Sequence, residues 1–237
     1  VEQMAGDIAQ FTNHPCLRFP AAETELAEQS ASDATYGERV RVLKALAQLP
    51  LHPPITSDQP ASPQLLVATS IQSLLQPVPP PQSLLNSTRQ LHVGQQLNVE
   101  DLLKWLVENR FQPTTAVALP GEFSHRGGIL DLFAPDWEHP VRIEFFDDQI
   151  ESLRRFDVAS QRSLGQQPSL EITIFRPHET GRGQLADYLP STTWWLWIEP
   201  RQIDDAARQY LSLLEAPANY HSLGDIQRAA SRHGIAQ

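Results

Sequence analysis

The run Val141–Phe146, with the sequence VRIEFF, constrains the fold of this chain more than any other segment. Its apolar side chains occupy every second position, and the inward-facing set is Val141, Ile143 and Phe145. The outward-facing set is Arg142, Glu144 and Phe146. Such alternation is typical of a half-buried antiparallel strand with its apolar face inward. It leaves an arginine and an aromatic ring on the outward face, and these residue types dominate protein-binding hot spots.

Two further β-patterned segments, Gly128–Phe133 and Gln149–Asp157, flank this run. We predict that the first pairs with it in antiparallel fashion, with Phe133 opposite Val141. That register sets Gly128 opposite Phe146, so no facing side chain covers the ring. It also places two rows of residues on one face: Arg126, Gly128, Leu130 and Leu132 across from Asp148, Phe146, Glu144 and Arg142.

The motifs RGGILDLF, VRIEFFDDQIESLRRFD and SQRS follow one another within residues 126–163. Together they resemble the UvrB-homology module of bacterial transcription-repair coupling factors (Mfd), and the excision nuclease subunit UvrB has a related segment. One difference is Ala134, which stands before Pro135 where the family pattern has the proline directly after LDLF. This difference falls in the loop between two predicted strands.

The resemblance implies both a fold and a partner. The fold is a degenerate helicase-like α/β domain of the P-loop NTPase type, with a parallel sheet, interrupted by a small α+β insertion domain with an antiparallel sheet. The partner is UvrA, which binds the arginines of the RGG and VRIEFF motifs and the aromatic residue of the second. In this chain the matching residues are Arg126, Arg142 and Phe146.

Two proline-rich stretches, residues 50–63 and 77–81, divide the chain. We expect residues 1–87 to form the first part of the α/β domain and residues 88–172 the insertion that binds UvrA. Residues 173–237 are expected to return to the α/β domain.

Apolar periodicity predicts further elements along the chain. The predicted helices are Glu38–Leu49, Ile71–Gln76, one capped by Asn98 that ends near Asn109, and one from Pro200 to about Glu215. The predicted strands are Leu17–Phe19, Leu65–Thr69 and Thr193–Ile198. The last of these is apolar enough for a strand buried on both faces.

Composition disfavours several classes of function. The formal net charge of −10 disfavours sequence-independent binding of nucleic acid by this piece. Cys16 is the only cysteine, so an internal disulfide is impossible and a cytoplasmic, reducing location fits. The apolar run Trp194–Ile198 is too short to cross a bilayer, and we expect no membrane partner. Because the chain starts at Val1 without methionine, we interpret it as part of a longer protein.

Motifs that carry catalysis are missing from the sequence. It contains no G-x-x-x-x-G-K-[ST] loop, no H-E-x-x-H or cysteine–histidine cluster, and no G-x-S-x-G elbow. Asp147 and Asp148 lie between strand patterns and are predicted as turn residues rather than metal ligands. Glu199, a single carboxylate, is predicted to cap a helix rather than to hold magnesium. We therefore predict a non-catalytic chain without a cofactor, and expect ATP and magnesium only in motor domains outside it.

The resemblance indicates a protein-interaction module that recruits UvrA, in nucleotide excision repair, to RNA polymerase stalled at damaged DNA. RNA polymerase and DNA would be bound by other parts of the full-length protein. The alternative is a fragment of UvrB that engages UvrA and damaged DNA. UvrB carries a tyrosine-rich hairpin for DNA, whereas the four tyrosines of this chain, at positions 36, 188, 210 and 220, are dispersed.

The residue pattern alone also allows a purely structural interpretation. In that interpretation Arg142 pairs with Glu144 or Asp148 on a solvated face, and Phe146 packs beneath Leu130 or the following segment. Arg154 and Arg155 are expected to have structural roles. A hydrolase that uses the carboxylates near Asp147 has little support, because nothing in the sequence fixes them around a pocket.

Overall fold

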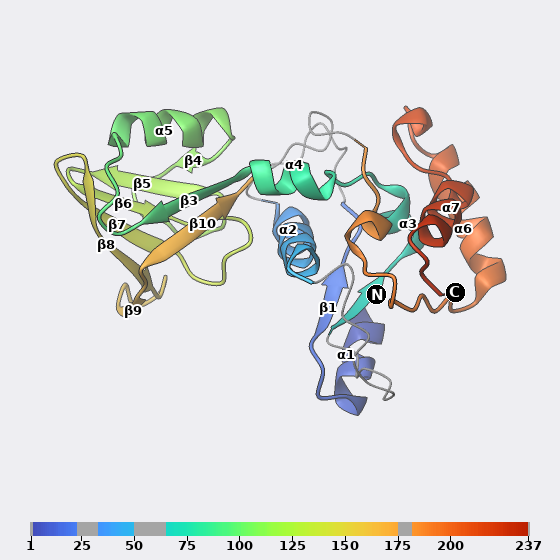
Figure 1. Ribbon diagram of the computed structural model, residues 1–237. Coiled ribbons are helices and arrows are strands. Elements are labelled where there is room, and N and C mark those ends of the chain that lie inside the picture. Colours follow the sequence, from blue (N-terminus) through green and yellow to red (C-terminus); the bar gives the residue numbers. More distant parts are fainter. Residues whose placement is uncertain (1, 23–32, 50–64, 175–181, 237) are drawn as a thin grey trace. The chain divides into compact units, whose positions relative to one another are not determined.

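The computed structural model describes residues 2–22, 33–49, 65–174 and 182–236. These residues fall into two compact units (Figure 1). The described residues of the first unit lie within 1–27, 42–83 and 176–237, and those of the second within 28–41 and 84–175. The expected domain boundaries near residues 88 and 172 stay a prediction.

The first unit contains a pair of parallel strands, β1 (Cys16–Phe19) and β2 (Leu66–Thr69). Both strands were predicted to within one residue, and Phe19 at the end of β1 is fully buried. Together with the antiparallel strands of the second unit, they make the protein a mixed α/β structure with several sheets.

Helices supply most of the remaining first unit. They are α1 (Glu2–Phe11), α3 (Ile71–Leu75), the 3-10 helices η1 (Leu185–Tyr188) and η2 (Pro217–Asn219), α6 (Pro200–Ser212) and α7 (Leu223–Arg232). Helix α4 (Pro81–Asn86) spans the boundary between the units at residues 83 and 84. Helix α2 (Ala34–Ala47) spans the sequence boundary between the two units. It confirms the helix predicted at Glu38–Leu49, and its Val40, Leu43 and Leu46 are buried as the apolar spacing requires.

The prediction of a buried strand at Thr193–Ile198 is wrong. The segment makes a single β-bridge, between Trp194 and Ala236, and Trp194, Leu196 and Ile198 are exposed. A strand is buried on both faces only when neighbouring strands and covering helices enclose it. In the described residues this segment instead lies beside the last residues, with the amide of Trp195 donating to the carbonyl of Ala236 at 2.8 Å.

Glu199 stands at the N-cap of α6, but not in the predicted role. Its backbone adopts a left-handed conformation with φ of 57°, and its side chain makes no capping hydrogen bond. The backbone carbonyl of Glu199 instead accepts from the amide of Gln202 at 2.9 Å. The helix starts because Pro200 at the first helical position has a preset φ and lacks an N–H that would need a partner.

His221 is a buried polar residue of the first unit. Its Nε2 lies 3.1 Å from the carbonyl oxygen of Gly183, and because a carbonyl can only accept, the hydrogen is on Nε2. The charged groups that face the ring are Arg182, Asp187 and Asp225. Burial is the main reason that the pKa of His221 lies below its ordinary value of 6.5.

Acidification is therefore expected to destabilise the first unit through His221. With its pKa lowered in the folded state, the unfolded chain binds more protons, so stability falls as the pH drops below 6.5. Urea unfolding at about pH 7.5 and about pH 5.5 checks this. The variant His221→Gln keeps a donor for Gly183 but cannot titrate, and it should lose less stability than the native chain. Equal losses in both proteins would contradict the expectation.

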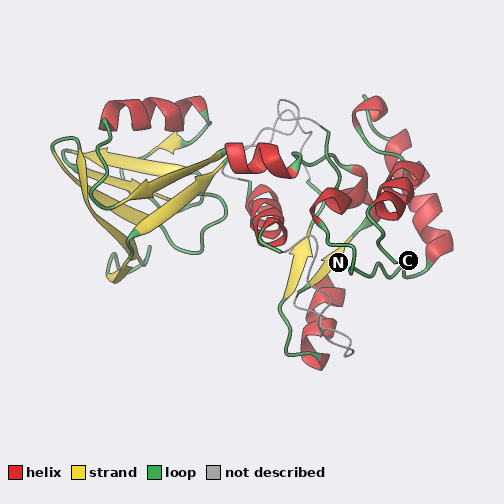
Figure 2. Cartoon of the chain, viewed as in Figure 1, coloured by secondary structure: helices red, strands yellow, loops and turns green. Residues whose placement is uncertain are grey.

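The second unit is built on a six-stranded sheet with the order β4-β5-β6-β7-β8-β9. Its strands are among the yellow arrows of Figure 2. The strands are β4 (Gln112–Pro113), β5 (Glu122–Arg126), β6 (Ile129–Leu132), β7 (Val141–Phe146), β8 (Gln149–Phe156) and β9 (Ser163–Gln166). Neighbours from β5 to β9 pair antiparallel, and β4 pairs with β5 in parallel. The predicted strand at Val141–Phe146 is confirmed with its bounds unchanged.

One face of this sheet packs against helix α5 (Val99–Glu108), which lies along the sheet in Figure 1. The helix begins as predicted, because the side chain of Asn98 accepts from the amide of Asp101 at 3.1 Å. Fully buried members of the shared core are Leu102, Leu106, Leu130, Leu132 and Ile143. Each such side chain contributes about 1.5–3 kcal/mol by leaving water.

Two strands at the ends of the second unit pair with each other. They are β3 (Thr88–His92) and β10 (Ser169–Thr173), antiparallel, with Thr88 opposite Thr173. The hydroxyl oxygens of these two threonines are 2.9 Å apart, within hydrogen-bond distance. Leu91, Leu170 and Ile172 extend the core from this pair.

The first part of helix α2, up to Arg41, belongs to the second unit and packs against its loop at Pro135. Gly37 lies against the backbone of Pro135 so closely that a Cβ on Gly37 would overlap the proline carbonyl oxygen. The side chain of Arg41 donates from Nε to the carbonyl of Asp136 at 3.3 Å. The loop in which Ala134 precedes Pro135 is therefore covered by this helix.

Among the residues described, none of the helices combines the length and the apolar character that crossing a bilayer requires.

Candidate protein-interaction face

The register between β6 and β7 differs by one residue from the prediction. Val141 stands opposite Leu132 rather than Phe133, and Arg142 stands opposite Asp131. A slip of one residue moves every side chain of a strand to the other face. Leu130 and Leu132, predicted on the outward face, are therefore fully buried on the inward face. The observed register buries two leucines against the core, which the hydrophobic effect favours, and places Asp131 on the other face, where it is buried beneath its partner Arg142.

Side chains that alternate away from the core form a second surface of the sheet, which we call the outer face. Residues opposite each other in the register lie on the same side of a sheet, so membership follows from the pairing. The outer face comprises Ser124, Arg126, Ile129, Asp131, Arg142, Glu144, Phe146, Gln149, Ser152, Arg154 and Gln166. The three residues expected to bind a partner are therefore on one face.

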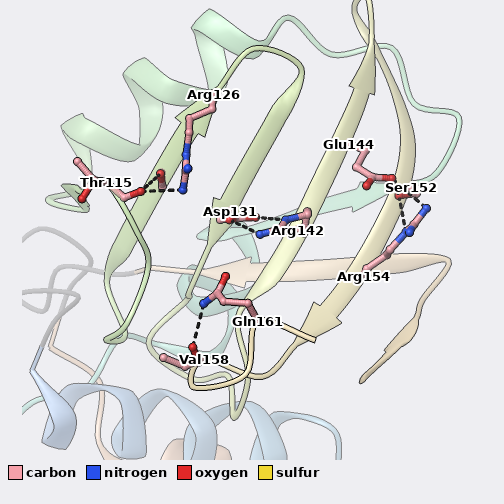
Figure 3. Close-up of polar contacts among 10 residues, drawn as sticks. Thr115, Arg126, Asp131, Arg142, Glu144, Ser152, Arg154, Val158 and Gln161 are labelled. Carbon is pink, nitrogen blue, oxygen red and sulfur yellow. Dashed lines mark hydrogen bonds and ion pairs between the residues drawn. The ribbon is translucent and has the colours of Figure 1, made fainter. Parts of the chain in front are cut away.

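Arg142 is held by an ion pair with Asp131 on the neighbouring strand (Figure 3). Its Nε donates to Oδ1 at 2.7 Å and its Nη2 to Oδ2 at 2.8 Å. The guanidinium carbon lies 5.0 Å from the centre of the Phe156 ring, which suits a cation–π contact. The hydrogen bond to Asp131 is the main reason that the pKa of Arg142 is raised. The partners considered from the sequence, Glu144 and Asp148, are not the ones that form this pair.

A second ion pair joins Glu144 to Arg154, with Arg154 Nη2 lying 3.1 Å from Glu144 Oε2 (Figure 3). Ser152 stands between them, because its hydroxyl donates to Glu144 Oε2 and accepts from Arg154 Nε at 3.2 Å. Arg154 thus has the structural partner expected for it. The two cations of β7 and β8 on this face are both balanced by carboxylates.

Arg126 differs from these two arginines. It is exposed at the end of β5 and donates from Nη2 to the carbonyl oxygen of Thr115 at 2.8 Å (Figure 3). Among the residues that the structure describes, no carboxylate forms an ion pair with it. Its guanidinium therefore keeps most of its five N–H groups available for a partner.

Phe146 is the most exposed of the large apolar side chains on the outer face, at 69% of its full area. It is the last residue of β7, where Asp147 and Asp148 form the two-residue turn to Gln149. Asp147 has φ of 50°, which confirms the predicted turn. The alternative in which Phe146 packs beneath Leu130 is wrong, because Leu130 is on the inward face.

The two glycines of the RGG motif shape the hairpin that carries Arg126. Gly127 adopts φ of 58°, and Arg126 pairs with Ile129 across a two-residue turn. A Cβ on Gly128 would lie 2.8 Å from the carbonyl oxygen of Phe145. The amide of Phe145 donates to the carbonyl of Gly128 at 2.7 Å. Gly128 thus lies against the backbone of Phe145, and the prediction that it stands opposite Phe146 is wrong.

Ile129 was missed by the sequence interpretation. It is 40% exposed, lies opposite Arg126 and Glu144 in the register, and adds an apolar surface beside the charged pairs. The alternation of the segment ILDL could have revealed this, because if Leu130 and Leu132 face the core, then Ile129 and Asp131 face the other side.

The segment that contains the outer face matches a known domain family. Residues 90–176 match the sequence model of the UvrB interaction domain.

Curated relatives match a larger part of the chain. The transcription-repair-coupling factor of Mycobacterium tuberculosis is 41% identical over 173 residues, which is 72% of this chain and 13% of that protein. The protein of the same name from Staphylococcus aureus is 32% identical over 174 residues, or 73% of this chain and 14% of the relative. The one from Bacillus subtilis is 34% identical over 122 residues, or 49% and 10%.

The chain thus spans about one seventh or less of the length of these relatives. The family match and the relatives point to the same assignment, and the outer face lies inside the matched segment. Residues 90–176 of the chain thus resemble the UvrB interaction domain, and the chain is similar to one segment of the transcription-repair-coupling factors.

Proposed function

We propose that the second unit binds UvrA through the outer face, with Arg126, Arg142 and Phe146 at the centre of the site. The observation that supports this most directly is the exposed ring of Phe146 on the same face as both arginines, within the matched domain. In the complete protein, this non-catalytic unit brings UvrA to RNA polymerase stalled at damaged DNA.

The chemistry of the face suits a protein partner. Phe146 and Ile129 offer apolar surface that gains free energy when water is removed from it. Arg126 offers a fork of N–H donors that matches a carboxylate. Aromatic and arginine side chains of this kind are the usual anchors of protein interfaces.

The rest of the chain takes a supporting role in this proposal. The first unit, with its parallel strands β1 and β2 and its flanking helices, is a degenerate helicase-like domain into which residues 88–172 are inserted. RNA polymerase, DNA, ATP and magnesium are bound by other parts of the complete protein. The relatives leave room for such parts, since each is several times longer than this chain.

A fragment of UvrB remains the alternative, because the matched domain carries that name. The relatives named transcription-repair-coupling factor favour the first proposal. The two proposals differ in whether this chain itself binds damaged DNA, which only the UvrB alternative requires. Binding to lesion-bearing DNA that weakens with salt in a gel-shift experiment would favour the UvrB alternative.

Arg126→Ala tests the proposed site directly. The change removes a guanidinium that has no carboxylate partner within the described part of the chain. It is expected to weaken binding of UvrA by about 1–2 kcal/mol, measured by isothermal titration calorimetry. The matched control is Arg155→Ala. Arg155 is an exposed arginine that pairs with the buried Val141 and so belongs to the opposite face. Equal affinities for the Arg126 variant and the native chain would count against the site.

A further inference from the structure

We propose that Asp131 is a positioning residue of this site, which acts through Arg142 and does not itself touch UvrA. The inference rests on the proposed function. It assigns a role to a carboxylate on a surface whose expected binding residues are cations and an aromatic ring.

The geometry of the pair supports a positioning role. Asp131 engages the Nε and Nη2 edge of the guanidinium with two hydrogen bonds, at 2.7 and 2.8 Å. A guanidinium has five N–H groups, so the Nη1 group and one hydrogen of Nη2 stay available. The bidentate pair fixes the plane of the group, and the ring of Phe156, 5.0 Å from the guanidinium carbon, supports that plane.

Burial separates the roles of the two side chains. The side chain of Asp131 is 7% exposed, whereas that of Arg142 is 31% exposed. A partner that docks on the outer face can therefore reach Arg142 while Asp131 lies beneath it. Arginine has many rotamers, and ordering such a side chain on binding costs affinity. Asp131 removes that cost because it orders Arg142 in the free protein.

A purely electrostatic account predicts the opposite effect on UvrA binding when the charge of Asp131 is removed. If the cations of the face attract acidic groups of UvrA, removing the charge of Asp131 makes the face more positive and should tighten binding. If Asp131 positions Arg142, the same change should weaken binding. The sign of the effect therefore distinguishes the two accounts.

The test uses the 237-residue chain and purified UvrA in isothermal titration calorimetry. Asp131→Asn keeps the shape of the side chain but replaces one acceptor with an amide, and we expect binding to weaken about five- to tenfold. Asp205→Asn is the matched control, because it removes a carboxylate that holds an arginine, Arg208, on α6 of the first unit and not on the outer face. That control should bind UvrA as tightly as the native chain. Equal weakening in both variants would overturn the proposal.

A double variant shows whether Asp131 acts through Arg142. In an Arg142→Ala background, the additional change Asp131→Asn should alter affinity by less than about twofold, since its target is gone. A full five- to tenfold loss in that background would contradict the positioning role. Arg142→Lys supplies a second measurement that does not disturb the buried carboxylate. It keeps the charge and loses the fork, so it should weaken binding to a similar extent.

The outcomes separate this inference from the function on which it rests. If the native chain does not bind UvrA, both are wrong. A different outcome is that the native chain binds UvrA and Phe146→Ala weakens that binding, whereas Asp131→Asn has no effect. In that case the proposed function stands and only the positioning role is wrong.

Discussion

Phe146→Ala is expected to weaken binding of UvrA by at least about 2 kcal/mol, roughly a thirtyfold rise in Kd. The ring is 69% exposed in the free protein, so its removal costs little stability while the complex loses its main apolar anchor. Calorimetry gives the affinity, and urea unfolding should show a change within about 0.5 kcal/mol. An unchanged affinity would refute the assignment of Phe146.

Phe11→Ala is the matched control for this change. Phe11 is also an exposed phenylalanine, at 90% of its full area, but it belongs to α1 in the first unit. Its removal should leave the affinity for UvrA unchanged. If both variants bind equally weakly, the interaction is a non-specific response to apolar surface and not a property of the outer face.

Gly37→Ala is expected to destabilise the protein by about 1–3 kcal/mol. The added Cβ would overlap the carbonyl oxygen of Pro135, and neither backbone can move without disturbing helix α2 or the buried loop. Alanine is otherwise the better helix former, by about 1 kcal/mol relative to glycine. A net loss in urea unfolding therefore means that the steric clash outweighs the gain in helix propensity.

Gly6→Ala is the control for the loss of stability expected from Gly37→Ala. Gly6 is also within a helix, α1, and a Cβ there would have no atom within 4 Å. This variant should be more stable by up to about 1 kcal/mol. A gain at both positions would show that α2 yields to the added methyl group and that its contact with Pro135 is loose.

The strand β7 and the face of its side chains could be predicted from the sequence, because six residues with strict alternation specify both. The register in which β6 pairs with β7 was predicted wrongly by one residue. The prediction placed Leu130 and Leu132 outward, although their burial with Ile143 contributes far more than any outward contact. The motif ILDL contains the information needed for the correct register, because its two leucines favour the core face of the sheet and its aspartate favours the outer face.

The partner of Arg142 depended on that register and was missed with it. A cross-strand ion pair is visible only when the residues opposite each other are known. With the strands displaced by one residue, Arg142 faced a leucine, and the carboxylates considered were neighbours in sequence. Asp131, eleven positions away, became its partner through the hairpin.

The apolar run at Thr193–Ile198 was misjudged for another reason. Hydrophobicity predicts that a segment prefers burial, but the structure must also supply neighbours. Here the described residues provide one bridge to Ala236, and the side chains of Trp194 and Leu196 remain exposed. Sequence patterns therefore predicted the elements of the second unit better than the packing of the first.

The pairing of β3 with β10 has a consequence for how such modules are inherited. Thr88 and Thr173 are the points at which the polypeptide enters and leaves the pair, and they stand opposite each other in it. Neighbouring strands are about 5 Å apart, so a host needs only two adjacent attachment points to accept the module. We therefore expect that the interval between these two threonines can be moved to another host in one piece, together with the part of α2 that packs on Pro135.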